Sequence, residues 1–365
     1  MIKILQGNCL DKLKELPDQS INTCITSPPY WGLRDYGTAE WEGGDPNCDH
    51  IQPQQKRGEN SKKQSTNNKG QGGTKSKICK KCGAVRKDKQ LGLEDTPEEF
   101  VDNLVQVFRE VKRVLRDDGT VWLNLGDSYS SGGRTTTTNQ SLRGDKDYGV
   151  TRPKPNKGIK PKDLIGIPWR VAFALQQDGW YLRQDIIWHK PNPMPESVRD
   201  RCTKAHEYIF LLSKNVKYYF DNEAIKEDAK YPQGPNSPQS IKKGKGMYGM
   251  DTRGGLSNVG ALAKKNKRSV WTVTTKPFKG AHFATFPIDL IEPCVLAGCP
   301  ENGTVLDPFG GSGTTGIVAN NHNRKAVLIE LNSEYIEIAK QRIQDQGGLF
   351  TDLEIISGDS KGVNG

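Results

Sequence analysis

The sequence predicts an α/β fold, in which helices cover both faces of a doubly wound, mostly parallel sheet. Short apolar runs alternate along the chain with amphipathic segments of helical period, which is typical of a sheet built from crossover units. A glycine-rich turn between an apolar run and a helical segment, at 304–316, is a second feature of such sheets. A chain of 365 residues suits one large domain or two domains.

Apolar runs mark the predicted strands of this sheet. They lie at residues 2–5, 21–27, 120–126, 181–188, 207–213, 304–309 and 325–331. We therefore expect seven strands, most of them parallel because helical segments connect them.

The clearest predicted helix begins at the sequence TPEEF. Thr96 suits the N-cap, Pro97 the first helical position, and Glu99 can complete a capping box. Apolar residues then recur at helical spacing from Phe100 until Gly119, where we expect the helix to end. Similar patterns predict helices at 8–16, 167–178, 287–298, 313–321 and 333–344.

Two long segments interrupt this alternation. Residues 52–77 contain almost nothing that could be buried, so we expect a disordered or mobile loop there. Residues 221–280 are rich in Lys, Gly, Asn and Pro. A segment of that length inside a compact domain usually has a function or a small fold of its own.

The composition limits the classes of protein and of partner. Lys and Arg number 53 against 43 Asp and Glu, a net charge of +10. This balance is compatible with a polyanionic partner and equally with a solvated basic surface. No apolar run approaches the ~20 residues of a membrane helix. The N-terminal MIKILQGN lacks the parts of a secretory signal, so we expect a cytoplasmic protein.

The glycine-rich turn TVLDPFGGSGTTG has the features of a cofactor site. Glycines at a strand-to-helix turn let the backbone approach a ligand, and the helix N-terminus offers free amides. The next predicted strand ends at Glu330, where an acid can accept hydrogen bonds from ribose hydroxyls. The turn matches neither a P-loop nor G-x-G-x-x-G. The pattern indicates an adenosine-type cofactor, and the alternative is an ordinary tight turn whose acid caps the strand.

A second unusual stretch, TSPPYWGLRDYG at 26–37, follows directly after an apolar run. Proline has a fixed φ and no amide donor, so it is confined to strand ends, edges and bulges. Taken alone, this stiff, aromatic corner could be a simple strand-ending turn.

Together the two stretches resemble the β-class DNA amino-methyltransferases, which use S-adenosylmethionine. That family pairs a [D/N/S]-P-P-[Y/F/W] motif for the target base with a DPFxGSGTT-type cofactor loop. The base motif precedes the cofactor loop here, as in the circularly permuted β class, and the resemblance covers most of the chain. It implies a Rossmann-like sheet of the class I methyltransferase type, double-stranded DNA as partner, and target recognition by residues 221–280. Whether a cognate restriction endonuclease exists is left open.

The resemblance also assigns roles to individual residues. It places the target base at Ser27, Pro28, Pro29 and Tyr30, where Ser27 and the Pro28 carbonyl would accept the amine hydrogens and Tyr30 would stack on a flipped base. It assigns the methionine end of the cofactor to Asp307, Phe309, Gly311, Gly313 and Thr314, and the ribose to Glu330. Asn8 stands where the family usually has Asp near the adenine amine, and its side-chain oxygen would accept the same hydrogen bond more weakly.

The leading serine of the base motif resembles N4-cytosine enzymes more than N6-adenine ones, and we expect cytosine N4 as the target with adenine N6 as the alternative. Pro293-Cys294 has the residues of a C5-cytosine nucleophile, but Cys294 lies in an apolar helical pattern and reads as a packed thiol. We expect Cys9, Cys24, Cys202 and Cys299 to pack as well.

The last predicted site is a metal centre. Cys48-x-His50 and Cys79-x-x-Cys82 flank the polar segment 52–77. Four soft ligands in two close pairs suit a structural, tetrahedral zinc ion that would fasten the base of this loop.

These predictions divide the chain into catalytic parts at 1–47, 91–220 and 281–365, a zinc-binding insertion at 48–90 and the recognition region at 221–280. A non-catalytic zinc-bearing nucleic-acid-binding protein, or a methyltransferase for RNA or protein, are the alternatives.

Overall fold

The computed structural model describes residues 1–32, 38–50, 78–87, 90–130, 159–229, 264–275, 286–347 and 352–356. The predicted loop 52–77 and most of the predicted recognition region 221–280 lie outside the described residues. Within the described residues, no helix has the length and apolar character needed to cross a bilayer.

A nine-stranded central sheet forms the frame of the described part of the chain, in the order β10-β6-β7-β5-β2-β11-β12-β1-β13. All seven predicted strands belong to it, and β10 and β13 extend its two edges beyond the prediction. The strands are β1 (Ile2–Gln6), β2 (Ile21–Thr26), β5 (Leu115–Leu125), β6 (Tyr181–His189), β7 (His206–Ser213), β10 (Val270–Thr272), β11 (Thr304–Asp307), β12 (Lys325–Glu330) and β13 (Leu353–Ile356).

The sheet is mostly parallel, as predicted. Only β7 runs against its neighbours, because it pairs antiparallel with both β5 and β6. The other paired strands are parallel, including β10 with β6 and β1 with both β12 and β13. Residues 270–272 of the predicted recognition region therefore belong to the central sheet as β10.

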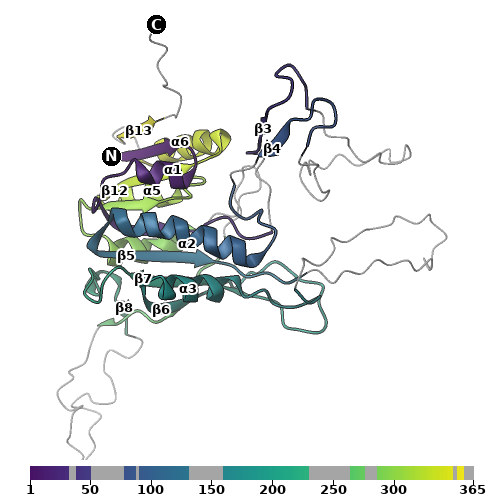
Figure 1. Ribbon diagram of the computed structural model, residues 1–365. Coiled ribbons are helices and arrows are strands. Elements are labelled where there is room, and N and C mark those ends of the chain that lie inside the picture. The colour runs from purple at the N-terminus through teal and green to yellow at the C-terminus, as the bar shows by residue number, and fades with distance from the viewer. Residues whose placement is uncertain are drawn as a thin grey trace, which may run out of the picture.

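Helices cover both faces of this sheet (Figure 1). One face packs against α1, α2 and α3, which contact one another in sequence order, and the other against α4, α5 and α6. Each layer has its own apolar core, one centred on α2 and one on α4 and α5. The helices are α1 (Cys9–Lys14), α2 (Pro97–Val114), α3 (Ile167–Gln177), α4 (Ile288–Gly298), α5 (Thr314–Asn321) and α6 (Ser333–Gly347).

Helix α2 begins as predicted and ends earlier than predicted. The Thr96 hydroxyl accepts the Glu99 amide at 3.2 Å, which makes Thr96 the N-cap. The Glu99 carboxylate accepts the amide of Asp95, one residue before the cap, rather than that of Thr96. The prediction that Gly119 ends the helix is wrong, because Leu115 already pairs with Ile21 in the sheet.

The point where the sheet reverses its winding lies between β2 and β11. From β2 the chain crosses through α2 to β5, on one side, and from β11 it crosses through α5 to β12, on the other. In open α/β sheets the crevice at such a reversal, at the carboxyl ends of the strands, is where ligands bind. The SPPY corner follows β2 and the glycine-rich turn follows β11, so both reach this crevice.

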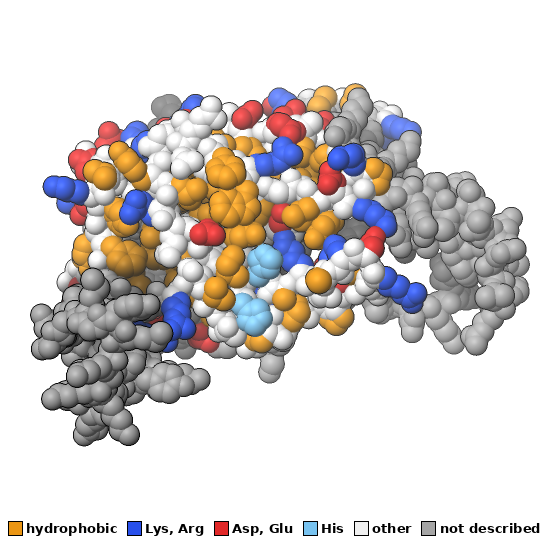
Figure 2. All heavy atoms as spheres, turned by 90° about the horizontal axis from the view of Figure 1, so that it is seen from below, with side chains coloured by type: hydrophobic (Ala, Val, Ile, Leu, Met, Phe, Trp, Pro, Cys, Tyr) orange, Lys and Arg blue, Asp and Glu red, His pale blue; other side chains and the backbone are white. Residues whose placement is uncertain are grey.

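Short elements accompany the main sheet. An antiparallel pair, β3 (Glu40–Glu42) and β4 (Val85–Lys87), stands apart from the sheet (Figure 1). A second pair, β8 (Glu227–Asp228) and β9 (Lys264–Lys265), follows the 3-10 turn η1 (Glu223–Ile225). Figure 2 views the molecule from the side of β6 and β8 and shows hydrophobic side chains, with two histidines side by side, among scattered charges.

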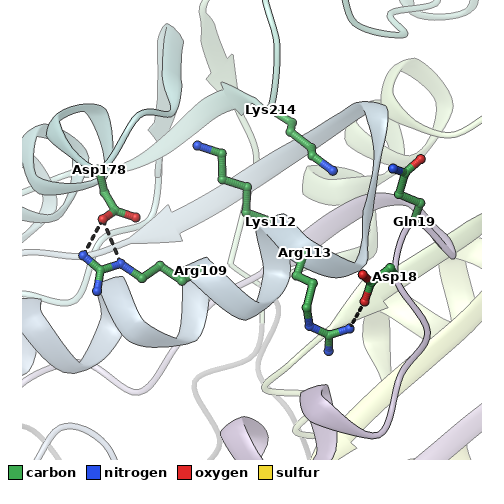
Figure 3. A pocket seen from close by; sticks show the side chains of 7 residues that line it. All are labelled: Asp18, Gln19, Arg109, Lys112, Arg113, Asp178 and Lys214. Atoms are coloured by element: carbon green, nitrogen blue, oxygen red, sulfur yellow. Dashed lines mark hydrogen bonds and ion pairs between the residues drawn. The ribbon is translucent and has the colours of Figure 1, made fainter.

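A hollow of about 590 Å³ lies at the amino ends of the parallel strands, opposite the crevice (Figure 3). Its cations are engaged by the protein itself. Arg109 pairs with Asp178 at 2.6 Å, Arg113 pairs with Asp18, and Lys112 donates to the carbonyl of Gly179 at 2.9 Å. These contacts hold α1, α2 and α3 together at that edge, so we assign this hollow a structural role.

Candidate active site

The crevice contains a cavity of about 480 Å³, within the range of small-molecule sites. Both sequence motifs line it, although about 280 residues separate them along the chain. They meet because each follows one of the two strands at the reversal point of the sheet. The predicted site residues on its wall are Asn8, Ser27, Pro28, Pro29, Tyr30, Phe309, Gly311 and Glu330. Thr38, Gln90 and Leu91, next to the Cys/His-bearing segments, also line it.

Glu330 holds the turn after β11 open towards the cavity. Its carboxylate accepts the amide of Gly311 at 2.8 Å and that of Asn332 at 2.8 Å. Gly311 has a φ of +49°, in the left-handed region that favours glycine. Burial raises the pKa of Glu330 above its ordinary value, against the backbone amides of Asn332, Gly311 and Leu331 that lower it. The acid at the end of β12 is thus linked directly to the glycine turn.

Asp307 lies beneath this turn rather than on the cavity wall. Its side chain is 1% exposed and accepts hydrogen bonds from the hydroxyls of Thr26 and Thr315, each at 2.6 Å. The amide of Phe309 donates to it as well, at 3.1 Å. Burial raises the pKa of Asp307 to about 6. The carboxylate therefore connects the ends of β2 and β11 with the start of α5, and so positions both motifs.

Gly313 and Thr314 face α6. A Cβ at Gly313 would come within 3.0 Å of the Ala339 Cβ, so the glycine allows the turn to approach that helix. The Arg342 guanidinium donates to the Thr314 hydroxyl at 3.2 Å and also contacts Ser312. Of the predicted cofactor residues, these two and Asp307 are not on the cavity wall.

Asn8 lines the cavity at the end of β1 and is the N-cap of α1. Its side-chain oxygen accepts the amide of Leu10 at 2.9 Å. Asn is a favoured N-cap residue, so this position has a structural reason to be polar.

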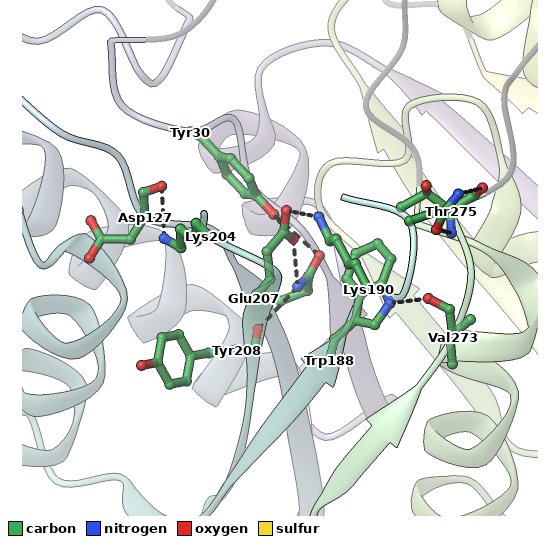
Figure 4. Close-up of polar contacts among 11 residues, drawn as sticks. Tyr30, Asp127, Trp188, Lys190, Lys204, Glu207, Tyr208, Val273 and Thr275 are labelled. Atoms are coloured by element: carbon green, nitrogen blue, oxygen red, sulfur yellow. Dashed lines mark hydrogen bonds and ion pairs between the residues drawn. The ribbon is translucent and has the colours of Figure 1, made fainter. Parts of the chain in front are cut away.

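The SPPY corner is fixed by a network at the ends of β5, β6 and β7 (Figure 4). The Tyr30 hydroxyl donates to Glu207 at 2.7 Å and lies 3.3 Å from the side-chain oxygen of Asn124. Lys190 pairs with the other Glu207 oxygen. Burial raises the pKa of Tyr30 well above its ordinary value, and the Glu207 charge adds to this. The ring is therefore held as a neutral phenol.

Lys190 and Glu207 line the cavity, but the sequence did not single them out. Lys190 lies 4.1 Å from the ring centroid of Trp188, whose indole donates to the carbonyl of Val273 at 2.8 Å. Lys190 directly follows β6, and Glu207 lies at the start of β7. In the sequence, their charge at strand ends is the only sign of a role in the site. That sign becomes specific only once the antiparallel pairing of β6 and β7 is known.

Asp127, at the end of β5, is a helix cap. Its carboxylate accepts the amides of Ser128, Gly166 and Ile167 at 2.9–3.2 Å, which places it at the N-terminus of α3. The Lys204 ammonium donates to the Asp127 carbonyl at 2.9 Å (Figure 4), and burial lowers the pKa of Lys204.

The four predicted metal ligands come together beside β3 and β4. The ligand atoms of Cys48, His50, Cys79 and Cys82 all lie within 4.8 Å of one another. The Cys48 and Cys79 sulfurs are 3.9 Å apart, and Cys82 Sγ lies 3.4 Å from His50 Nδ1. In a tetrahedral zinc site with standard bond lengths these edges measure ~3.8 Å and ~3.5 Å. These two distances match those of a zinc site.

The remaining cysteines divide into two groups. Cys9, Cys24, Cys294 and Cys299 are buried, as expected. Burial raises the pKa of Cys294, which lies within α4, so it is a packed thiol. The expectation that Cys202 packs is wrong, because it is exposed on the loop between β6 and β7.

Comparison with known proteins gives a consistent picture. Residues 21–341 match the family model N6_N4_Mtase, described as DNA methylase. The Type II methyltransferase M.SmaI of Serratia marcescens is 44% identical over 344 residues, covering 93% of this chain and 90% of that protein. The Type II methyltransferase M.Cfr9I of Citrobacter freundii is 42% identical over 343 residues, covering 94% and 88%.

Solved structures show the same fold. A putative DNA modification methylase from Thermus thermophilus, TTHA0409, complexed with S-adenosyl-L-methionine, aligns with a TM-score of 0.55 and 19% identity over 98% of this chain and 99% of that one. The PvuII DNA methyltransferase (cytosine-N4-specific) aligns with a TM-score of 0.53 and 17% identity over 95% and 91%.

Proposed function

The chain belongs to the DNA methylase family of N6 and N4 methyltransferases, and we propose that it transfers a methyl group from S-adenosylmethionine to the N4 amine of a flipped cytosine in double-stranded DNA. The observation that carries this proposal is that the SPPY corner and the glycine-rich turn line one cavity. A base held by the first motif would there meet a cofactor held by the second.

The walls of the cavity fit the proposed cofactor. A Cβ at Gly310 would lie 3.0 Å from that of Leu328, so the lack of a side chain lets the turn pack directly against β12. We assign the ribose hydroxyls to Glu330, the adenine end to Asn8, and the methionine end to Phe309, Gly311 and the turn around them. Asp307, Gly313 and Thr314 act on the cofactor indirectly, because they hold the turn in place. When bound, S-adenosylmethionine supplies an electrophilic methyl group.

The base corner would activate the amine. The lone pair of an exocyclic amine is delocalised into the ring, so the free amine is a poor nucleophile. We propose that Ser27 and the carbonyl of Pro28 accept its two hydrogens and draw the nitrogen towards tetrahedral geometry. Pro28 and Pro29 fix that carbonyl in advance, and Tyr30, immobilised by Glu207, offers a face for stacking. Catalysis would then rest on positioning and electrostatic support, without a covalent enzyme intermediate.

Cytosine is favoured over adenine on two grounds. The motif begins with serine, and the PvuII enzyme that shares the fold is named as cytosine-N4-specific. Adenine N6 is the alternative, because the family model includes both. The buried, helical position of Cys294 argues against C5 chemistry.

We further propose a structural zinc ion bound by Cys48, His50, Cys79 and Cys82. Four protein ligands would complete a tetrahedron and leave no position for a reacting water. Because Thr38, Gln90 and Leu91 line the cavity next to these segments, the ion would also stabilise one wall of the active site. The relatives named Type II methyltransferases support a pairing with a restriction endonuclease, which we propose as the biological context.

Two variants test whether the SPPY corner serves the base and Glu330 serves the cofactor. Ser27→Ala should bind S-adenosylmethionine with unchanged affinity in calorimetry and lose transfer of labelled methyl to duplex DNA. Glu330→Ala should weaken cofactor binding by about tenfold or more, since it removes charged hydrogen bonds. Failure of the wild-type protein to bind S-adenosylmethionine would overturn the proposal. Cofactor binding without transfer to any duplex would refute DNA as the substrate.

A further inference from the structure

The loop between β6 and β7 is a braced projection beside the cavity. It occupies residues 190–205, and its base is closed by a hydrogen bond from the Lys190 amide to the Ala205 carbonyl at 2.8 Å. Asn192 is joined to Thr275, after β10, by two hydrogen bonds of 3.1 Å each. Because β6 is parallel to the strands that carry the two motifs, the loop projects from the same edge of the sheet.

The far side of the loop is braced as well. Glu196 accepts a hydrogen bond from Arg201 at 2.6 Å and one from the Lys204 amide at 3.3 Å. The Arg201 guanidinium lies 3.8 Å from the ring centroid of Tyr129. Both arms of the loop are thus tied to the body of the protein.

Met194 stands between these braces with its side chain in solvent. It is 86% exposed, more than any other large apolar side chain among the described residues, and it also lines the cavity. Pro193 and Pro195 flank it. Their fixed φ angles, and the restriction that a proline places on the residue before it, limit the backbone freedom of Met194. The methionine is therefore held outward at the rim of the active site, although burial would be favourable for it.

The chemistry around Met194 matches a nucleic-acid duplex. Proteins insert apolar wedges, methionine among them, between base steps of a duplex, and a base that leaves the stack opens such a space. The thioether makes favourable contacts with aromatic rings. Three cations of the loop make contacts within the protein, whereas Arg199, five residues after Met194, is exposed. An exposed arginine beside the wedge suits a phosphate next to that space.

Resting on the proposed function, we propose that Met194 enters the DNA stack and occupies the space vacated by the target base while that base lies in the cavity. The loop 190–205 is then a flipping element. Its contacts with Thr275 and Tyr129 would keep the loop in position while the duplex is open.

A comparison of two duplexes tests this role. The methylated site is first mapped with the wild-type protein. One duplex then carries the target in its normal pair, and the other has an abasic site opposite the target, so that no pairing opposes its exit. Met194→Ala should lower the single-turnover methylation rate on the paired duplex by about tenfold or more and leave the rate on the abasic duplex within about twofold of wild type.

Two further variants complete the experiment. Met194→Leu keeps an apolar wedge and should restore the rate on the paired duplex. Val216→Ala removes another exposed apolar side chain, 67% exposed at the opposite edge of the sheet, and should change neither rate. Equal losses on both duplexes, or no loss on the paired one, would overturn the wedge while leaving the methyltransferase function intact. If the wild-type protein methylates neither duplex, the proposed function fails and the wedge with it.

Discussion

Single residues at the carboxyl edge of the sheet act mainly by fixing one another. Tyr30 is positioned by Glu207 and Asn124, and Glu207 is balanced by Lys190. The absence of a side chain at Gly126 is part of the same arrangement, because a Cβ there would lie 2.6 Å from the Tyr30 ring. The geometry of the proposed base pocket therefore depends on a residue that bears no functional group.

Gly126→Ala tests this dependence. The added methyl should displace the Tyr30 ring and lower the methylation rate by roughly 10- to 100-fold, since small misplacements of a substrate-positioning group are costly. Cofactor affinity should not change. In a Tyr30→Ala background the Gly126 substitution should add little further loss, because the clash no longer exists. Additive losses would show that Gly126 acts elsewhere.

Asp307 makes the stability of the protein depend on pH. Its pKa of about 6 in the folded state lies above the ordinary 3.8, so the folded state holds the proton more tightly than the unfolded chain. The stabilisation from this group is fully present below pH 3.8 and is lost as the pH rises through 6. A shift of this size corresponds to about 3 kcal/mol.

Asp307→Asn should remove that dependence. Other groups titrate equally in both proteins, so the difference between their free energies of unfolding isolates Asp307. Urea denaturation between pH 4 and 8 should show the wild type losing up to about 3 kcal/mol relative to the variant as the pH rises. A difference that stays constant over this range would contradict the assigned cause.

Helices and strands were largely predictable because each carries a local signal. Helix α2 has a cap, a proline and a helical apolar period, and the strands of the central sheet are mostly continuous apolar runs. The end of α2 was not predictable, because the pairing of Leu115 with Ile21 in the sheet competes with continued helix. Strands β10 and β13 are short and lie at the edges, so their identity depends on a neighbouring strand rather than on their own sequence.

Thr96→Ala tests the cap of α2. Loss of the hydroxyl leaves the Glu99 amide without its 3.2 Å acceptor and should lower the free energy of unfolding by about 1 kcal/mol. Thr96→Ser keeps the oxygen and should retain most of the stability. Methylation by the folded fraction should be unchanged in both. Equal stability of Thr96→Ala and wild type in urea denaturation would argue that the cap contributes nothing.

The whole molecule brings together segments that are distant in sequence. The ordered pair of motifs predicted a shared site, and the reversal point of the sheet explains why they meet. The sequence could not predict that Asp307, Gly313 and Thr314 would lie off the cavity wall, because this depends on how α5 and α6 pack. Nor could it predict Lys190, Glu207 or Met194, which reach the cavity through the antiparallel β6–β7 pair.

Removal of the proposed zinc should weaken cofactor binding in the active site. Cys82→Ala, or treatment with a chelator, should lower the metal content from about one ion per chain and weaken the binding of S-adenosylmethionine, since Thr38 and Leu91, which line the cavity, flank the segments that carry the cluster in sequence. Cys202→Ala removes an exposed cysteine outside the cluster and serves as the control. Elemental analysis with calorimetry measures both quantities. Metal-free protein that binds the cofactor normally would separate the cluster from the active site.

The most direct test of the whole account is to identify the methylated nucleoside. Duplex DNA of varied sequence is incubated with the protein and methyl-labelled S-adenosylmethionine, digested, and analysed by mass spectrometry. The account predicts labelled N4-methylcytosine. Labelled N6-methyladenine would keep the amine chemistry and correct the base, whereas labelled 5-methylcytosine, or no labelled nucleoside at all, would contradict it.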